Sequence, residues 1–289
     1  MKSLRNVDVV VVGLGLMGGS LAGALRGRCR SVTGVARRDV AIETAQDRAL
    51  IDSGTTDLRA SLSRADLVVL ATPVRATIAL LEEIGPCLPA GALVLDLGTT
   101  KTTVVRAMAE LPPRVASVGG HPLCGSEASG VSAADPSLYR DRVFVLTPHG
   151  GTTADGLARA EALVRAIGAR PVVIAAERHD ALIAATVLLP YLIACGLTTT
   201  VACHATRDPL LWELAASGLR DTSRLAASDV TMMLDALMTD RGPVVELMRQ
   251  SAAALAQLGG LLTRGDEAAL GEALRSARTT RRRDLRCAN

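Results

Sequence analysis

The stretch VVVVGLGLMGG, residues 9–19, decides the fold of the chain. Its four valines are typical of a strand that is buried on both faces, as in a parallel sheet, and residues 20–25 read as a helix. Glycines at the first, third and sixth positions after the valines allow a tight turn, close approach of a pyrophosphate and packing of helix on strand. The helix N-terminus presents N–H groups to that phosphate. We therefore predict a dinucleotide site that includes Gly13, Gly15, Leu16, Met17 and Gly18.

Further strand-like runs alternate with helical patterns over the first three fifths of the chain. The runs are Val32–Val35, Leu67–Ala71, Leu93–Leu97, Val115–Gly119, Val143–Leu146 and Pro171–Ile174. Such alternation is typical of βαβ units around a parallel sheet. After residue 176 no strand signal follows. We therefore predict an α/β protein with a Rossmann-type dinucleotide-binding domain at residues 1–176 and an all-helical dimerisation domain at residues 177–289.

The helical half begins with an unusually apolar segment. Residues 181–203 include no charged side chain, so a membrane span is one interpretation. Pro190 in the middle of the segment, where it should kink a helix, and Gly196 favour the other one, a buried helix of an all-helical domain or dimer. Residues 244–262 place a second apolar stripe on a helix that Gly242 and Pro243 introduce. We expect a homodimer that shares this apolar surface, and no membrane partner.

Composition excludes several classes of protein. The chain has 289 residues, a net charge of +3 and 1% aromatic residues, so we expect no nucleic acid to bind. The six cysteines form no C-x-x-C pair and have no histidines at metal-ligand spacing, so they read as free thiols in a reducing compartment, with no metal. The first strand follows the N-terminus directly, and we expect a cytoplasmic protein without a signal peptide.

The end of the second strand predicts which dinucleotide binds. An acid at this place holds the ribose 2′-hydroxyl of NAD, whereas an arginine accommodates the 2′-phosphate of NADP. Here the strand ends in Ala36-Arg37-Arg38, and two guanidinium groups can grip a phosphate. A pair of surface arginines is the alternative. We predict NADP, bound in part by these three residues.

Three further stretches have the composition of a catalytic site. They are DLGTTK at residues 96–101, GGHPLCGSE at residues 119–127 and GLRDTSR at residues 218–224. The first two follow strands at the carboxyl edge of the sheet, where α/β proteins bind ligands. His121, in a glycine-rich turn, suits a base for a hydroxyl proton, and an arginine from the helical half would clamp a carboxylate. Histidines 149, 179 and 204 have no comparable context, and we expect them to be surface or structural residues.

Together these stretches make the chain similar to the prephenate and arogenate dehydrogenase family of tyrosine biosynthesis. The resemblance also rests on VVGLGLMGGSLAGAL, ADLVVLATPV, YRDRVFVLTP and GARPVVIAAERHDALIAA, and so spans nearly the whole chain. It implies oxidative decarboxylation of a cyclohexadienyl substrate, with hydride transfer to nicotinamide. Within ADLVVLATPV, Thr72 and Pro73 are assigned to the cofactor site.

The resemblance also implies roles for individual residues. His121 matches a catalytic histidine that polarises the ring hydroxyl, and Thr99, where the family usually has serine, hydrogen-bonds the same group. Arg224 matches an arginine that binds a carboxylate. The remaining implied substrate residues are the two acids that position this arginine and a serine beside the substrate: Glu127, Asp221 and Ser126.

One motif departs from the family pattern. The family usually has Ser-His-Leu-Pro-His or Ser-His-Leu-Pro-x where this chain has VLLPY at residues 187–191. Both histidines are therefore missing, and we assign Tyr191 to the substrate site as a replacement hydroxyl. Loss of the second histidine and the Ala-Arg-Arg strand end both resemble NADP-dependent arogenate dehydrogenases. We thus expect arogenate as the small-molecule substrate.

Three alternatives remain open at this point. Prephenate could be the substrate, with NAD or NADP. A β-hydroxyacid dehydrogenase or a pyrroline-carboxylate reductase would share the two-domain plan, but the G-G-H-P and R-D-T-S-R motifs speak against both. A regulatory homologue that binds NADP without turnover is the non-enzyme alternative, and the missing histidines favour it.

Overall fold

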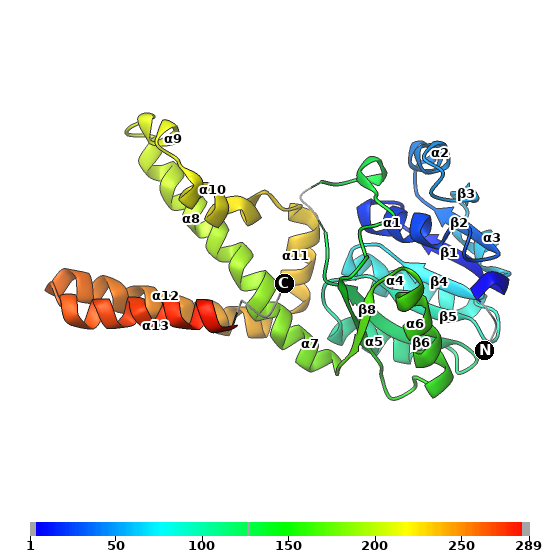
Figure 1. Ribbon diagram of the computed structural model, residues 1–289. Coiled ribbons are helices and arrows are strands. Elements are labelled where there is room, and N and C mark those ends of the chain that lie inside the picture. The colour runs from blue at the N-terminus through cyan, green and yellow to red at the C-terminus, as the bar shows by residue number, and fades with distance from the viewer. Residues whose placement is uncertain (1–3, 126–127, 285–289) are drawn as a thin grey trace. The chain divides into compact units, whose positions relative to one another are not determined.

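The structure is a computed structural model that describes residues 4–125 and 128–284 (Figure 1). Ser126 and Glu127, both assigned to the substrate site above, lie outside the described residues. The chain divides into two compact units, Met1–Arg241 and Gly242–Asn289, which are taken in turn. The predicted domain boundary at residues 176/177 lies at the start of a helix inside the first unit and stays a prediction.

An eight-stranded sheet forms the base of the first unit, with the strand order β3-β2-β1-β4-β5-β6-β7-β8. The valine run forms β1, which lies between β2 and β4 and pairs with both in parallel. The strands are β1 (Asp8–Val12), β2 (Ser31–Val35), β3 (Ser53–Thr55), β4 (Leu67–Leu70), β5 (Leu93–Asp96), β6 (Ala116–Pro122), β7 (Val143–Thr147) and β8 (Arg170–Val173). The predicted α/β fold class is confirmed.

Helices pack on both faces of the sheet because successive strand residues point to opposite sides. Val9 and Val11 belong to one core, to which helices α1, α2 and α6 contribute. Val10 and Val12 belong to a second core with helices α3, α4 and α5. These helices are α1 (Leu16–Leu25), α2 (Asp39–Asp47), α3 (Leu58–Leu62), α4 (Val74–Ile84), α5 (Thr102–Ala109) and α6 (Ala154–Ala166). The double burial explains the valine run without polar alternation.

Two features of the sheet differ from the sequence-based expectation. Strand β3 was not predicted, because three residues at a sheet edge leave no period to detect. Strand β7 runs antiparallel to β6, so the sheet is mixed rather than parallel throughout. This pairing also extends β6 to Pro122, and His121 therefore lies in a strand opposite Val145, not in the predicted turn.

Helices make up the rest of the first unit, starting with α7 (Ala176–Ile183), a π-helical turn (Ala184–Leu188) and α8 (Leu189–Ala205). Pro190, at the start of α8, cannot donate a backbone hydrogen bond, and the π turn immediately before it marks the predicted interruption. The remaining elements are α9 (Leu210–Glu213), α10 (Ser217–Ser223), a 3₁₀ turn η5 (Arg224–Ala227) and α11 (Val230–Thr239).

The stretch Ala176–Ala205 is long and apolar enough, by length and composition alone, to cross a membrane. In the most apolar 18 residues of this stretch, only 28% are buried within the single chain. Leu188 and Ala194 are buried, whereas Leu182 is 49% exposed. The expected buried helix is therefore buried on one side only.

The second unit consists of two helices, α12 (Arg241–Arg264) and α13 (Glu267–Asp284). Gly265 connects them with a φ of +63°, a left-handed conformation that favours glycine, and the Asp266 carboxylate accepts a hydrogen bond from the Ala269 amide at 3.0 Å. The predicted apolar stripe lies on α12, where Val244 is buried but Leu255 and Leu262 are exposed.

Candidate active site

The loop between β1 and α1 has the geometry of a phosphate cradle. Gly13 has a φ of +100°, and a Cβ atom there would lie 2.5 Å from the Ala71 carbonyl oxygen. A Cβ on Gly18 would lie 1.9 Å from the Gly13 carbonyl oxygen, so no side chain fits at either position. Gly15, in contrast, faces open space, and a Cβ there would meet no atom within 4 Å. The first and last glycines thus serve packing, and the middle one leaves room for a dinucleotide at the N-terminus of α1.

A tyrosine that the sequence analysis did not identify forms a hydrogen bond to the backbone that follows this loop. Tyr139, in the segment between β6 and β7, is fully buried and donates a hydrogen bond to the Met17 carbonyl oxygen at 2.6 Å. A buried tyrosine hydroxyl needs a partner, but nothing in the sequence around residue 139 shows which one. Met17 and Leu16, both assigned to the cofactor site, are therefore fixed in the first turn of α1.

The strand register brings the other predicted cofactor residues to the same edge. Val12, the last residue of β1, pairs with Val35 of β2 and with Leu70 of β4, so the loops after the three strands start side by side. Ala36 is half-buried, and the two following side chains, those of Arg37 and Arg38, are exposed. In the loop after β4, Thr72 Oγ1 lies 2.8 Å from Thr77 Oγ1, and Pro73 precedes the first turn of α4.

The end of β5 holds a buried ion pair. Asp96 and Lys101 have no exposed surface, and the Lys101 ammonium donates to Asp96 and to the Gly120 carbonyl oxygen. Asp96 also accepts from the Gly98 amide at 2.8 Å and from the Gly120 amide at 2.9 Å. One carboxylate therefore fixes the backbone just before Thr99 and just before His121. Burial lowers the pKa of Lys101, although Asp96 opposes the shift.

His121 is the first member of a buried hydrogen-bonded chain. Its Nδ1 lies 2.9 Å from Nε2 of His179, and Nδ1 of His179 lies 2.7 Å from Oδ1 of Asp180. All three side chains are at most 8% exposed. His179 and Asp180 belong to α7, and sequence reasoning had set His179 aside as a surface or structural residue. The structure places it instead in direct contact with the predicted catalytic histidine.

Asp180 fixes the protonation pattern of both rings. A carboxylate can only accept, so Nδ1–H of His179 is the donor, and the neutral tautomer with this proton has its lone pair on Nε2. Nδ1–H of His121 then donates to that lone pair, which leaves Nε2 of His121 as a free acceptor. Burial, and then the neighbouring His179, holds the pKa of His121 well below its usual value. The arrangement thus provides a neutral imidazole with an open lone pair, as a general base requires.

Asp180 also links α7 to the sheet edge. Its carboxylate accepts hydrogen bonds from the backbone amides of Lys101 and Thr102, both at 2.7 Å, and so caps the N-terminus of α5. Burial alone would raise the pKa of Asp180, but the bonds from His179, Thr102 and Lys101 outweigh it and lower the pKa. Asp180 is therefore a stable anion at neutral pH.

Helix α11 contacts two of the loops at the sheet edge. Asp235 accepts the Arg75 amide at 2.8 Å in the first turn of α4 and forms an ion pair with the Arg75 side chain. Thr239 Oγ1 lies 2.7 Å from Thr100 Oγ1, next to the half-buried Thr99. The helical segment is thereby attached both near Thr72 and Pro73, which are assigned to the cofactor site, and beside the predicted catalytic hydroxyl of Thr99.

The remaining predicted substrate residues lie on the helices. Tyr191 is buried in α8, whereas Asp221 in α10 and Arg224 in η5 are exposed in the single chain. Helix α8 packs against both α10 and η5. The structure thus groups Thr99 with His121 at the sheet edge, and groups Tyr191, Asp221 and Arg224 on the helices.

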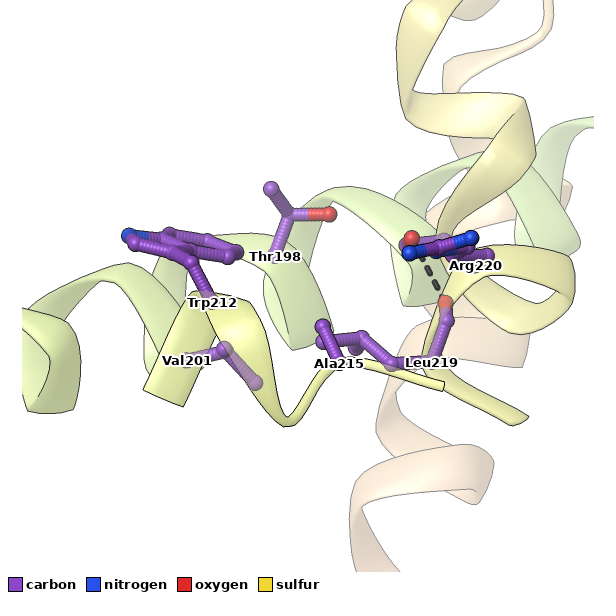
Figure 2. Close-up of a pocket in the computed structure, with 7 residues that line it drawn as sticks. Thr198, Val201, Trp212, Ala215, Leu219 and Arg220 are labelled. Atoms are coloured by element: carbon purple, nitrogen blue, oxygen red, sulfur yellow. Dashed lines mark hydrogen bonds between the residues drawn. The ribbon is translucent and has the colours of Figure 1, made fainter. Parts of the chain in front are cut away.

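A separate hollow of about 240 Å³ lies among α8, α9 and α10 (Figure 2). One side is formed by the indole of Trp212 and another by Leu219, whose carbonyl oxygen accepts a hydrogen bond from the Ser223 hydroxyl at 2.7 Å. None of the predicted site residues lines it. Among the described side chains, no group of three or more His, Cys, Asp and Glu residues could hold a metal ion.

Comparison with known proteins gives consistent matches along the chain. A family model described as "Prephenate dehydrogenase, nucleotide-binding domain" matches residues 21–173, and one described as "Prephenate dehydrogenase, dimerization domain" matches residues 175–276. The cyclohexadienyl dehydrogenase of Zymomonas mobilis is 33% identical over 243 residues, which is 82% of each chain.

Solved structures agree with these matches. Prephenate dehydrogenase from Aquifex aeolicus, in complex with hydroxyphenyl propionate and NAD+, has a TM-score of 0.90 and 30% identity, with 97% of this chain and 99% of that one covered. Synechocystis arogenate dehydrogenase has a TM-score of 0.80 and 29% identity, with 95% and 98% covered. With both family models matched and these structures covering nearly the whole chain, this chain belongs to the prephenate/arogenate dehydrogenase family.

Proposed function

We propose that the protein catalyses the oxidative decarboxylation of arogenate to tyrosine, with NADP as the hydride acceptor. The observation that carries the proposal is the chain of hydrogen bonds from His121 through His179 to Asp180, which leaves Nε2 of His121 able to accept a hydroxyl proton. Its position at the end of β6 puts this acceptor at the sheet edge that also has the glycine loop.

The residues of the chain act on the ring of the substrate. His121 takes the proton of the ring hydroxyl, and His179 and Asp180 stabilise the imidazolium that forms. Thr99 orients the same hydroxyl, while Arg224 holds a carboxylate. The ring carboxylate leaves as carbon dioxide and its bonding electrons stay in the ring, which becomes aromatic; the ring oxygen then takes back the proton from His121. Aromatisation makes the step irreversible. The nicotinamide, when bound, supplies the hydride acceptor.

Two features favour this cofactor and substrate over the alternatives within the family. Arg37 and Arg38 are exposed at the end of β2, with Ala36 where an NAD-binding acid would stand. Tyr191 occupies the place of the second histidine of the family motif, and loss of that histidine resembles arogenate-preferring members of the family. Prephenate with NAD is the second candidate, since relatives are described as prephenate dehydrogenases and one is described in complex with NAD+.

The proposed function is tested by a kinetic matrix of two substrates and two cofactors. We expect the largest kcat/KM with arogenate and NADP, measured as the rise in NADPH absorbance. If prephenate is the better substrate, it replaces arogenate in the proposal. If NAD is the better cofactor, it replaces NADP. Absence of turnover with all four combinations, in protein that binds NADP by fluorescence titration, would favour the regulatory homologue.

The role of His121 is tested by substitution of three histidines. We expect His121→Asn to lower kcat by on the order of 10²-fold or more with little change in the KM for substrate, because it removes the general base. His179→Leu should also lower kcat, since it removes the acceptor that fixes the His121 tautomer. His149→Asn is the matched control, because His149 bonds to Ser117 at the start of β6. Equal kcat values in all three variants would refute the proposed base.

The cofactor assignment is tested at the end of β2. Replacement of both Arg37 and Arg38 by alanine should raise the KM for NADP far more than the KM for NAD, because only NADP has the 2′-phosphate. Arg59→Ala, another exposed arginine in α3, is the control and should change neither constant. An equal effect of the double substitution on both cofactors would mean that these arginines do not read the 2′-phosphate.

We also propose that the protein is a homodimer formed through its helices. The matching family model describes this region as a dimerization domain. In the single chain, Trp212 in α9 is 50% exposed, Leu214 just after α9 is 73% exposed, and α11 exposes Val230 and Met238. Several large exposed apolar side chains within one region of a chain are typical of a subunit interface.

Sedimentation of the purified protein tests the homodimer. We expect the wild-type chain to sediment as a dimer, and the double substitution Trp212→Asp, Leu214→Asp to shift it toward the monomer, because buried unpaired carboxylates are costly at an interface. Val40→Asp, at an exposed apolar residue of α2, should leave the dimer intact. A wild-type monomer would contradict the proposal.

A further inference from the structure

A buried carboxyl lies at the end of α11, the helix that contacts the loop after β5. Asp240 follows α11 directly and is 7% exposed. Its Oδ2 is one of three buried side-chain polar atoms that have no hydrogen-bond partner among the described residues, and the only carboxylate oxygen of the three. An unpartnered buried carboxylate is costly, so such a group favours its neutral form. Nothing in the proposed chemistry of His121 has used this residue.

The charge that acts on Asp240 is that of Asp180. Burial, and then the negative charge of Asp180, raises the pKa of Asp240 to about 7. The other polar groups around Asp180 are His179 and the backbone amides of Lys101 and Thr102, all of which donate to it. The Lys101 ammonium is bonded to Asp96 instead. The pKa values of the two carboxyls are thus shifted in opposite directions. Asp180 stays ionised, whereas Asp240 can hold a proton near neutral pH.

The neighbouring residue places Asp240 beside the loop with the catalytic hydroxyl. Thr239 Oγ1 lies 2.7 Å from Thr100 Oγ1, and Thr100 follows Thr99. Thr100 also precedes Lys101, whose amide donates to Asp180, so Asp240 lies near the Asp180 end of the His121–His179–Asp180 chain, away from the free Nε2 of His121. From there it can influence the base only through electrostatics.

We propose that Asp240 is a positioning residue whose ionisation strengthens the histidine base of the reaction. This inference rests on the proposed role of His121. When His121 accepts the substrate proton at Nε2, the substrate O–H bond breaks, the Nε2–H bond forms, and the positive charge is shared with His179 along their hydrogen bond. Ionised Asp240 adds a second negative charge beside Asp180 and stabilises this cation; protonated Asp240 does not. Its own proton passes to water.

The first test is the pH dependence of kcat with the best substrate and cofactor. The wild-type kcat should rise through an ionisation near pH 7. Asp240→Asn, which keeps the shape but cannot ionise, should lose this rise and be slower at pH 8 by up to roughly tenfold, the equivalent of one pKa unit, with KM unchanged. Asp155→Asn, at an exposed carboxyl of α6, is the matched control and should keep the wild-type profile. Identical profiles for wild type and Asp240→Asn would overturn the proposal.

The second test measures the titration of Asp240 without turnover. The folded-state pKa lies near 7 and the ordinary value is 3.8, so the folded protein binds the proton more tightly between these pH values. The urea midpoint of the wild type, relative to Asp240→Asn, should therefore fall as pH rises from 4 to 7 and stay level above. A constant difference would also overturn the proposal. If the expected titration occurs but no substrate is turned over, the proposed function fails and the buried carboxyl pair stands.

Discussion

The buried ion pair between Asp96 and Lys101 is the constraint on which the catalytic edge depends. Two opposite charges without solvent are costly, and they are tolerated only where further hydrogen bonds satisfy them. Here those bonds go to the backbone of Gly98 and Gly120, the residues that precede Thr99 and His121. Loss of either charge would leave the other buried and alone. The positions of the two predicted catalytic side chains are thus fixed by one electrostatic cluster.

The helical segment completes a site that the sheet alone cannot form. The sheet edge provides His121 with a rigid backbone but with no partner for its Nδ1. Helix α7 provides His179 and Asp180, which set the tautomer of His121 and leave Nε2 as the acceptor. Helix α11 adds its own attachments, through Asp235 to α4 and through Thr239 to the loop after β5. The proposed base, His121, therefore depends on both the sheet and the helical segment of the first unit.

The sequence predicts well what depends on local backbone geometry. The glycine loop, the strands of the central sheet and the helix interruption before Pro190 each follow from a few adjacent residues, and the structure shows all of them. The antiparallel direction of β7 does not follow, because a strand of the same pattern can pair either way. Likewise, the bond from His121 to His179 joins residues 58 apart, and no spacing rule signals it. The family resemblance reached His121 and Thr99 but not their supporting residues.

The carboxylate of Asp180 serves two purposes at once, because it caps α5 and orients His179. The same carboxylate therefore contributes both to the stability of the fold and to the proposed catalysis. A transient release of α7 from the sheet would remove the cap of α5 and, at the same time, the partner that orients the proposed base His121. The glycine loop would keep its shape. Such an opened molecule could still hold its dinucleotide yet could not consume it. The position of α7 on the sheet is thus required both for the cap of α5 and for the orientation of the proposed base.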